Sequence, residues 1–189
     1  MTRRSAMCAT LMASTAPAAS RKSAAAAAAS AWERRLVEVL PQFGHRNWIV
    51  VADSAYPAQA RPSIETLLTA ADQIQVVGRV LGAITSSKHV TPTVYTDREL
   101  RFVAEANAPG ITAYRRQLGG VLKGYVVNEL AHERLIAQLD EAGQTFRVLI
   151  IKTSMTLPYT SVFLRLDCAY WNADAEQKLR AVMGSAPPK

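Results

Sequence analysis

A histidine and an aspartate flank one apolar segment, and they are the most informative chemical groups of this sequence. Gly44-His45 stands eight residues before Asp53, and the run over residues 48–52 between them is typical of a buried strand. An imidazole exchanges protons near neutral pH, and a carboxylate can orient it or accept a hydrogen bond from a ligand hydroxyl. Open α/β sheets bind ligands at the carboxyl ends of their strands. We therefore expect Asp53 to contact a ligand, and the loop that carries His45 leads into the same strand.

Two further polar groups lie at the borders of expected elements. His132 belongs to a segment with helical periodicity, and Tyr159 lies in the turn Pro158-Tyr159-Thr160-Ser161 before another apolar strand. Taken singly, a histidine is more often a satisfied structural group, and a tyrosine after proline more often packs. The hypothesis of a site rests on the imidazole of His45, the carboxylate of Asp53 and the phenol of Tyr159 sharing one cavity, within a subunit or across a boundary.

No cofactor and no metal are expected from the sequence. It contains no glycine-rich phosphate loop, no GxSxG elbow and no HExxH motif. Cys8 and Cys168 are its only cysteines, and no CxxC or Cys/His ligand spacing surrounds them. We interpret both as free thiols.

Strands alternate with helices along the chain, which predicts an α/β fold. The clear elements are a helix near 30–40, strands at 48–52, 146–151 and 161–166, an extended segment at 89–95, and helices at 97–106 (capped by Thr96 or Asp97), 129–143 and 173–183. Three segments are less regular: 63–71 fits a short helix or mixed structure, 75–80 fits a strand followed by a helix at 81–86, and 111–119 stays ambiguous.

The N-terminal segment is excluded from the fold. Residues 1–31 are rich in alanine and serine, which predicts either a disordered low-complexity extension or an export signal. Arg3-Arg4 and a mildly apolar stretch resemble a twin-arginine signal, although Ala6 and Met7 stand where an aromatic-leucine pair is usual. We expect a single domain over residues 32–183 with a tail over 184–189. The expected location is the cytoplasm, with export as the alternative.

Charge and hydropathy exclude two classes of partner. The chain carries a formal charge of +7, but residues 1–31 hold Arg3, Arg4, Arg21 and Lys22 and no acid, so the domain is only weakly basic. A nucleic-acid surface would show clustered basic residues with stacking aromatics, and none stands out. After the tail there is no apolar run of about 18 residues, so no membrane span is expected.

The order of these motifs resembles the D-ribose pyranase / L-fucose mutarotase (RbsD/FucU) family over about residues 36–170. The most specific block is Gly44-His45 to Asp53, reinforced by Tyr56-Pro57. The block from Pro158 to Leu164 comes next, and the His132-Glu133 match is looser. The resemblance implies a three-layer α/β/α domain with a mixed sheet.

The resemblance also implies a role for each candidate residue. His45 would be the catalytic acid/base, Asp53 a substrate ligand, and His132, Tyr159 and Ser161 contacts to sugar hydroxyls. Ser161 stands where the family has asparagine, and Ser154-Met155 where it has Gly-Glu. The expected function is a cofactor-free sugar isomerase (mutarotase or pyranase) that interconverts ring forms of a monosaccharide by histidine acid/base catalysis.

Two alternatives stay open for the function. One is a non-catalytic monosaccharide-binding or regulatory protein, and the other is an isomerase of an acyclic or modified sugar. The family forms pentamers stacked into decamers, so a homo-oligomer is expected. Phe163, Tyr170 and Trp171 could face a neighbouring subunit or form an ordinary core edge.

Overall fold

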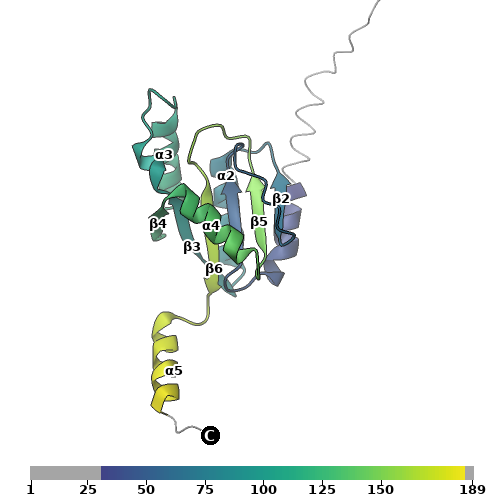
Figure 1. Cartoon of the computed structure of the whole chain (residues 1–189), viewed down its shortest axis with the longest axis vertical. Coiled ribbons are helices and arrows are strands. Elements are labelled where there is room, and N and C mark those ends of the chain that lie inside the picture. The colour runs from purple at the N-terminus through teal and green to yellow at the C-terminus, as the bar shows by residue number, and fades with distance from the viewer. Residues whose placement is uncertain (1–30, 186–189) are drawn as a thin grey trace, which may run out of the picture.

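The computed structural model describes residues 31–185, which form a central sheet covered by helices (Figure 1). The chain begins with a helix over residues 31–39. The strands are β1 (Trp48–Ala52), β2 (Ile64–Leu68), β3 (Val90–Asp97), β4 (Val127–Leu130), β5 (Val148–Lys152) and β6 (Val162–Cys168). The later helices are α2 (Gln73–Ser86), α3 (Ile111–Val121), α4 (His132–Ala142) and α5 (Ala173–Ser185).

The sheet is mixed. Its strand order is β2-β5-β1-β6-β3-β4. Strand β6 runs antiparallel to its neighbours β1 and β3, whereas the other pairs are parallel. The five parallel strands therefore end at one edge of the sheet, and β6 begins at that edge.

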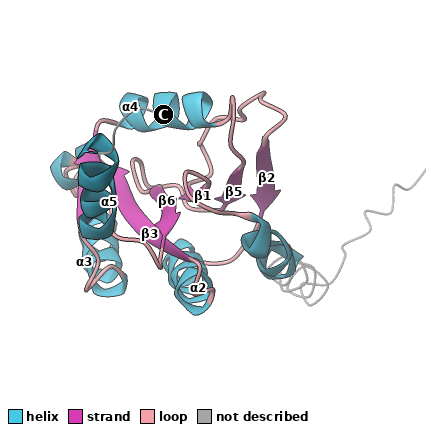
Figure 2. Ribbon diagram, turned by 90° about the horizontal axis from the view of Figure 1, so that it is seen from below, coloured by secondary structure: helices cyan, strands magenta, loops and turns pink. Residues whose placement is uncertain are grey.

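The helices cover both faces of the sheet (Figure 2). Helix α4 lies on one face, and the N-terminal helix, α2 and α3 lie on the other. Strand β1 is buried throughout, and its side chains alternate between the two layers: Val50 packs with Leu135 of α4, and Val51 packs with Ile84 of α2. This arrangement confirms the three-layer α/β/α fold with a mixed sheet.

Two local predictions were wrong. The strand expected over 75–80 is part of α2, because Val76, Val80 and Ile84 recur at helical spacing and are buried on one side. The β-branched run looks like a strand in a short window, yet Asp72 caps a helix by accepting a hydrogen bond from the Gln75 amide. The segment 63–71 contains the edge strand β2, in which Ile64 is buried and the later residues alternate between half-buried and exposed.

The helix expected over 97–106 is also wrong. A short 3-10 helix, Arg98–Phe102, follows β3, and the longer helix α3 begins only at Ile111. Gly110 precedes α3 with a φ of 97°, and its amide donates to the Glu105 carboxylate. This left-handed residue turns the chain into α3, which covers the edge of the sheet next to β4.

Replacing Gly110 with alanine is expected to destabilise the fold by about 1 kcal/mol, because a Cβ is unfavourable in the left-handed region. No atom lies within 4 Å of the position of that Cβ, so the cost comes from the backbone alone. Chemical denaturation measures it. Gly82→Ala, within α2 and equally free of close atoms, is the control and should not destabilise the protein. Equal losses in both variants would contradict the conformational argument.

Helix α5 projects from the body of the domain (Figure 1). Its residues are largely exposed, including Leu179, Val182 and Met183. Of the three aromatic residues noted near the C-terminus, Phe163 is a core residue, whereas Tyr170 and Trp171 are exposed. Within residues 31–185, no helix has the length and apolar character needed to cross a membrane. The proposed export signal or disordered extension lies outside the described residues.

Candidate functional site

Polar side chains gather where the parallel strands end. Asp53 follows β1, Asp97 ends β3, His132 opens α4 directly after β4, and Ser161 precedes β6. Because β6 runs against the other strands, its first residues lie beside the last residues of β1. This edge is the place at which open α/β sheets bind ligands.

Asp53 and Ser161 form a buried pair. Ser161 Oγ donates to Asp53 Oδ2 over 2.9 Å, and the backbone amide of Ala55 donates to Asp53 Oδ1 over 2.9 Å. The amide of Asp53 donates back to Ser161 Oγ over 3.2 Å. Asp53 is 7% exposed and Ser161 is fully buried. The pair connects the turn after β1 to the start of β6. It holds the carboxylate of Asp53 in a buried position at the carboxyl edge of the sheet.

His132 is held from two directions. Its Nδ1 donates to Asp97 Oδ1 over 3.0 Å, which leaves Nε2 as the ring nitrogen directed elsewhere. Its backbone amide donates to the carboxylate of Glu99, with nitrogen–oxygen distances of 3.1 and 3.2 Å. Both acids come from the end of β3 and the 3-10 helix, so they position the imidazole at the start of α4.

Asp97 is a buried carboxylate that sequence reasoning treated only as a helix cap. Burial raises its pKa to about 6, and the hydrogen bond from His132 opposes that rise. Its Oδ2 is buried and has no hydrogen-bond partner among the described residues. The sequence carries little signal for this role, because Asp97 meets His132 across 35 positions of the chain through the β3–β4 pairing.

Two tyrosines stand around the imidazole. The ring of Tyr159 lies edge-on to His132 with 5.6 Å between centroids, and Tyr56 lies 6.5 Å away in the same manner. Tyr56 is buried, which raises the pKa of its phenol, whereas Tyr159 is 39% exposed. The Nζ of Lys152 donates to the backbone oxygen of Tyr56 over 2.7 Å. Tyr159 therefore offers the accessible phenol of the group.

Hydrogen bonds from two buried side chains hold the turn that carries Tyr159. The backbone oxygen of Thr160 accepts hydrogen bonds from Tyr114 Oη (2.6 Å) and Gln73 Nε2 (2.5 Å), both of them buried. Tyr159 itself has a φ of 58°, a left-handed conformation that costs an L-residue free energy. Such strain persists where the surroundings enforce it, and it is common at ligand sites.

His45 lies at the opposite end of the sheet. It precedes β1 and Asp53 follows it, so the five-residue strand separates them by about 17 Å at roughly 3.3 Å per residue. The imidazole is 55% exposed, and its Nδ1 lies 3.2 Å from Asp167 Oδ1 at the end of β6. The structure therefore brings together Asp53, Ser161, His132 and Tyr159 within one subunit, and it sets His45 apart in a cavity of its own.

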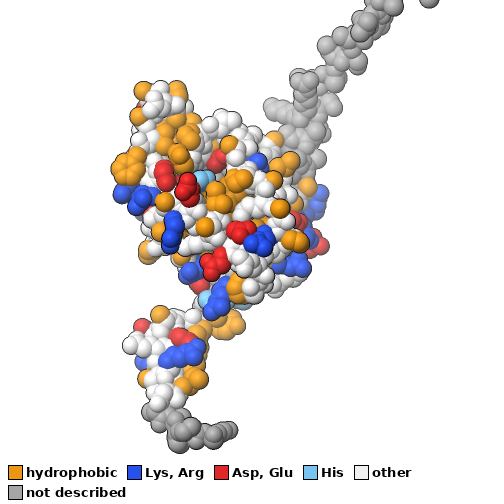
Figure 3. Space-filling view, viewed as in Figure 1, with side chains coloured by type: hydrophobic (Ala, Val, Ile, Leu, Met, Phe, Trp, Pro, Cys, Tyr) orange, Lys and Arg blue, Asp and Glu red, His pale blue; other side chains and the backbone are white. Residues whose placement is uncertain are grey.

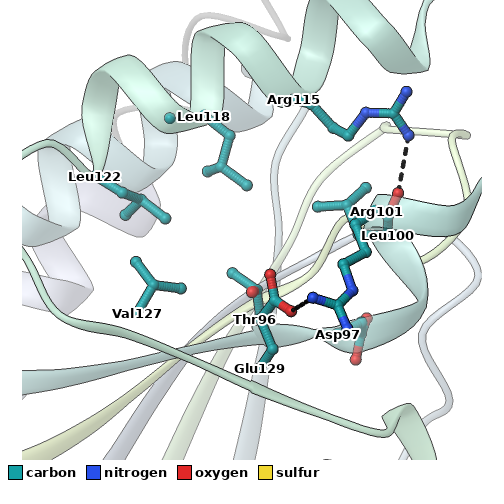
Figure 4. Close-up of a pocket in the computed structure, with 10 residues that line it drawn as sticks. Thr96, Asp97, Leu100, Arg101, Arg115, Leu118, Leu122, Val127 and Glu129 are labelled. Carbon is teal, nitrogen blue, oxygen red and sulfur yellow. Dashed lines mark hydrogen bonds and ion pairs between the residues drawn. The ribbon is translucent and has the colours of Figure 1, made fainter.

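A cavity of about 250 Å³ lies between α3 and the end of the sheet, and Asp97 is one of the residues that line it (Figure 4). Leu118, Leu122 and Val127 give it an apolar wall. Its arginines are already engaged: Arg101 pairs with Glu129 over 3.1 Å, and Arg115 donates to backbone oxygens, that of Leu100 among them. Asp97, whose Oδ2 has no hydrogen-bond partner among the described residues, gives this cavity a polar group beside its apolar wall.

Within the described part of the chain, no group of three or more His, Cys, Asp or Glu side chains could hold a metal ion. Cys168 is a free thiol at the end of β6, which agrees with the interpretation from sequence.

Residues 29–168 match the model of the RbsD / FucU transport protein family. The chain belongs to this family. The match includes every candidate site residue, from His45 to Ser161, and it ends at the last residue of β6. Among curated proteins, none matches this sequence.

Solved structures of RbsD and FucU proteins are similar to this chain, and the RbsD structure supports the same fold. RbsD from Bacillus subtilis, complexed with D-ribose, is 16% identical with a TM-score of 0.51, and the match covers 70% of this chain and 91% of that one. FucU from Bifidobacterium longum is 15% identical with a TM-score of 0.49, covering 72% and 94% of the two chains. The fucose mutarotase from Streptococcus pneumoniae, in complex with L-fucose, is 18% identical with a TM-score of 0.47, covering 70% and 91%.

Proposed function

We propose that the protein is a cofactor-free sugar isomerase that interconverts ring forms of a monosaccharide. The observation that carries the proposal is the cluster of Asp53, His132 and Tyr159 at the carboxyl edge of the sheet, in a chain of the RbsD/FucU family. A carboxylate, an imidazole and a phenol provide the acceptors and donors that a small ring with several hydroxyls requires. The family includes proteins named as ribose-bound RbsD and fucose mutarotase, which supports a sugar as ligand.

The reaction needs only proton transfers. The anomeric hydroxyl loses a proton while the ring oxygen gains one, the ring opens, and the carbonyl rotates before the ring closes again. General acid–base catalysis by a positioned imidazole contributes about 10²–10⁴-fold. In this proposal His45 exchanges the proton and Asp53, His132 and Tyr159 hold the hydroxyls, while the buried Ser161 orients the carboxylate of Asp53.

The proposal requires two copies of the chain at each site, because His45 and Asp53 lie at opposite ends of β1. His45 of one copy would face the Asp53 cluster of the next. When head-to-tail contacts of this kind form a closed ring, every site in the ring is completed in the same way. We propose a homo-oligomer of this kind, a pentamer or a decamer.

A non-catalytic monosaccharide-binding protein is the second candidate. Asp53 already accepts two hydrogen bonds within its own subunit, from Ser161 and from the amide of Ala55. Ser154 and Met155 add no carboxylate to the loop after β5. Both features are compatible with a pocket that binds sugar without moving protons.

Anomer exchange separates the two candidates. The full chain is mixed with a panel of aldoses that includes D-ribose and L-fucose, and saturation-transfer NMR measures exchange between anomers. Exchange above the spontaneous rate supports the isomerase. Sugar-induced thermal stabilisation without exchange supports the binding protein, and neither effect with any sugar contradicts both. Light scattering on the same sample measures the size of the oligomer.

A further inference from the structure

The cavity that contains His45 has a volume of about 910 Å³ and is built from two parts of the chain. One wall comes from the domain, with His45, Arg46 and the end of β6. The other wall comes from Trp171 and α5, including Arg180. The family match ends at residue 168, so the second wall lies outside the matched region. Figure 3 shows histidine, basic and hydrophobic side chains together where α5 joins the domain.

Both ring nitrogens of His89, which lines this cavity, lie against backbone oxygens. Its Nδ1 lies 2.9 Å from the backbone oxygen of Ser87, and its Nε2 lies 2.9 Å from that of Phe43. Carbonyl oxygens only accept hydrogen bonds, so both ring nitrogens donate when the ring is an imidazolium. The two backbone contacts accordingly raise the pKa of His89.

The carboxylates of the cavity are already satisfied. Asp167 accepts hydrogen bonds from Thr93 over 2.5 Å and from Arg165 over 3.2 Å, and it also faces His45. Glu176 accepts from its neighbours Trp171 and Arg180, over 2.7 Å each.

Positive charge therefore exceeds negative charge around the cavity. Its two carboxylates stand against three guanidinium groups, those of Arg46, Arg165 and Arg180. Arg46 lies over the ring of Phe146, and the Nε of Arg165 is buried with no hydrogen-bond partner among residues 31–185. Guanidinium groups with free donors bind phosphate and carboxylate oxygens well.

The indole of Trp171 supplies the apolar part of the same wall. Its Nε1 donates to Glu176, and Glu176 also holds Arg180, so one carboxylate orients both side chains. An aromatic ring in this place offers a flat apolar surface to the C–H face of a sugar. The guanidinium lies one helical turn further along α5.

We propose that this cavity binds a monosaccharide carrying an anionic group, phosphate or carboxylate, and that the C-terminal segment over residues 169–185 selects it. The inference rests on the proposed function, because His45 lies in the same cavity. The sugar ring lies near His45 and Trp171, and its anionic group lies among the arginines.

Titration of the full chain with matched sugars tests the ligand class. The probes are D-ribose and D-ribose 5-phosphate, D-glucose and D-glucose 6-phosphate, and D-glucuronate, with inorganic phosphate alone. Calorimetry measures Kd and NMR measures anomer exchange. At least one anionic sugar should bind about tenfold more tightly than its neutral parent, since a charge-assisted hydrogen bond is about twice as strong as a neutral one. Phosphates and glucuronate separate the two anionic groups.

Point variants locate the binding energy. Arg180→Ala and Arg46→Ala, one on each wall, should each raise the Kd of the anionic sugar about tenfold and leave that of the neutral parent within about twofold. Lys178→Ala is the matched control, because Lys178 is a cationic residue of α5 that does not line the cavity. It should leave both Kd values unchanged.

The outcomes separate this inference from the proposed function. Neutral sugars that exchange and bind as tightly as their anionic derivatives overturn the inference and leave the isomerase intact. Anionic sugars that bind without exchange support the ligand class and contradict the isomerase. Inorganic phosphate that binds as tightly as the sugar phosphates overturns the inference, because the site would then recognise an anion alone.

Discussion

Replacing His45 with alanine is expected to lower the catalysed rate of anomer exchange by about 10²–10⁴-fold, because the general acid–base contribution is lost. The imidazole is 55% exposed and makes one side-chain contact, to Asp167, so the fold should tolerate the change. Exchange is measured by saturation-transfer NMR on the sugar that the wild-type chain turns over. Lys178→Ala is the control, since Lys178 is a cationic residue of α5 that does not line this cavity. A His45→Ala chain as active as the wild type would contradict the role of His45.

A mixing experiment tests whether the site is shared between subunits. Asp53→Ala removes the opposite half of the site, and each variant alone should be inactive. When the two variants are unfolded and refolded together in equal amounts, a site made of His45 from one copy and Asp53 from the next is intact in roughly a quarter of the contacts. About a quarter of the wild-type activity should therefore return. No recovery in mixed oligomers of normal size would show that one subunit supplies both groups.

The sequence predicts the positions of the strands that carry the site better than the partners of its side chains. The run over residues 48–52 is buried on both faces and is recognised as a strand because β-branched residues fill it. The pattern of residues 48–52 is therefore enough to predict that Asp53 lies at the carboxyl edge of the sheet. Ser161 lies 108 positions after Asp53 in the chain, and the pairing of β6 with β1 brings the two residues together. The sequence around either residue does not indicate this pairing.

The position of His45 shows a second limit of sequence reasoning. Asp53 follows His45 by eight positions, and in a compact loop this spacing would allow the two groups to meet. Because the intervening residues form an extended strand, the same spacing drives the groups apart. A motif that joins both residues therefore indicates a site only if a second copy of the chain supplies one of them.

The sequence gives wrong secondary structure for segments whose local residue pattern does not indicate the element that forms. Residues 75–80 contain three β-branched valines, and only the longer repeat through Ile84 reveals α2. The edge strand β2 is held by tertiary partners, among them the pair of Arg35 with Glu65, whose carboxylate pKa is lowered by the guanidinium. Helix α2 and strand β2 are both stabilised by contacts with residues outside the short segment from which secondary-structure propensity is read.

Replacing Asp97 with asparagine is expected to stabilise the protein at pH 8 and to weaken sugar binding. Burial raises the pKa of Asp97 from 3.8 to about 6, so the folded state holds the proton more tightly than the unfolded state. The stability that this group contributes is complete below about pH 4 and is lost as the pH rises through about 6. Above that range the ionised carboxylate costs up to about 3 kcal/mol, and the neutral amide avoids this cost.

The same substitution should disturb the site. Asparagine cannot hold His132 with a charged acceptor, so the orientation of the imidazole beside Tyr159 is less strongly fixed. We expect the Kd or KM for the sugar to rise about tenfold. A gain in stability combined with a loss of affinity is typical of a buried charge kept for function, whereas a residue kept only for folding would lose both or neither.

Denaturation between pH 4 and 8 measures the effect, with Asp140→Asn as a control of opposite sign. Asp140 accepts two hydrogen bonds from Arg61, which lower the pKa of its carboxyl. That pair contributes stability above the unfolded pKa, so Asp140→Asn should lose stability at pH 8 and approach the wild type at low pH. If Asp97→Asn behaved like Asp140→Asn, Asp97 would be a stabilising partner of His132, and its burial would need no functional explanation.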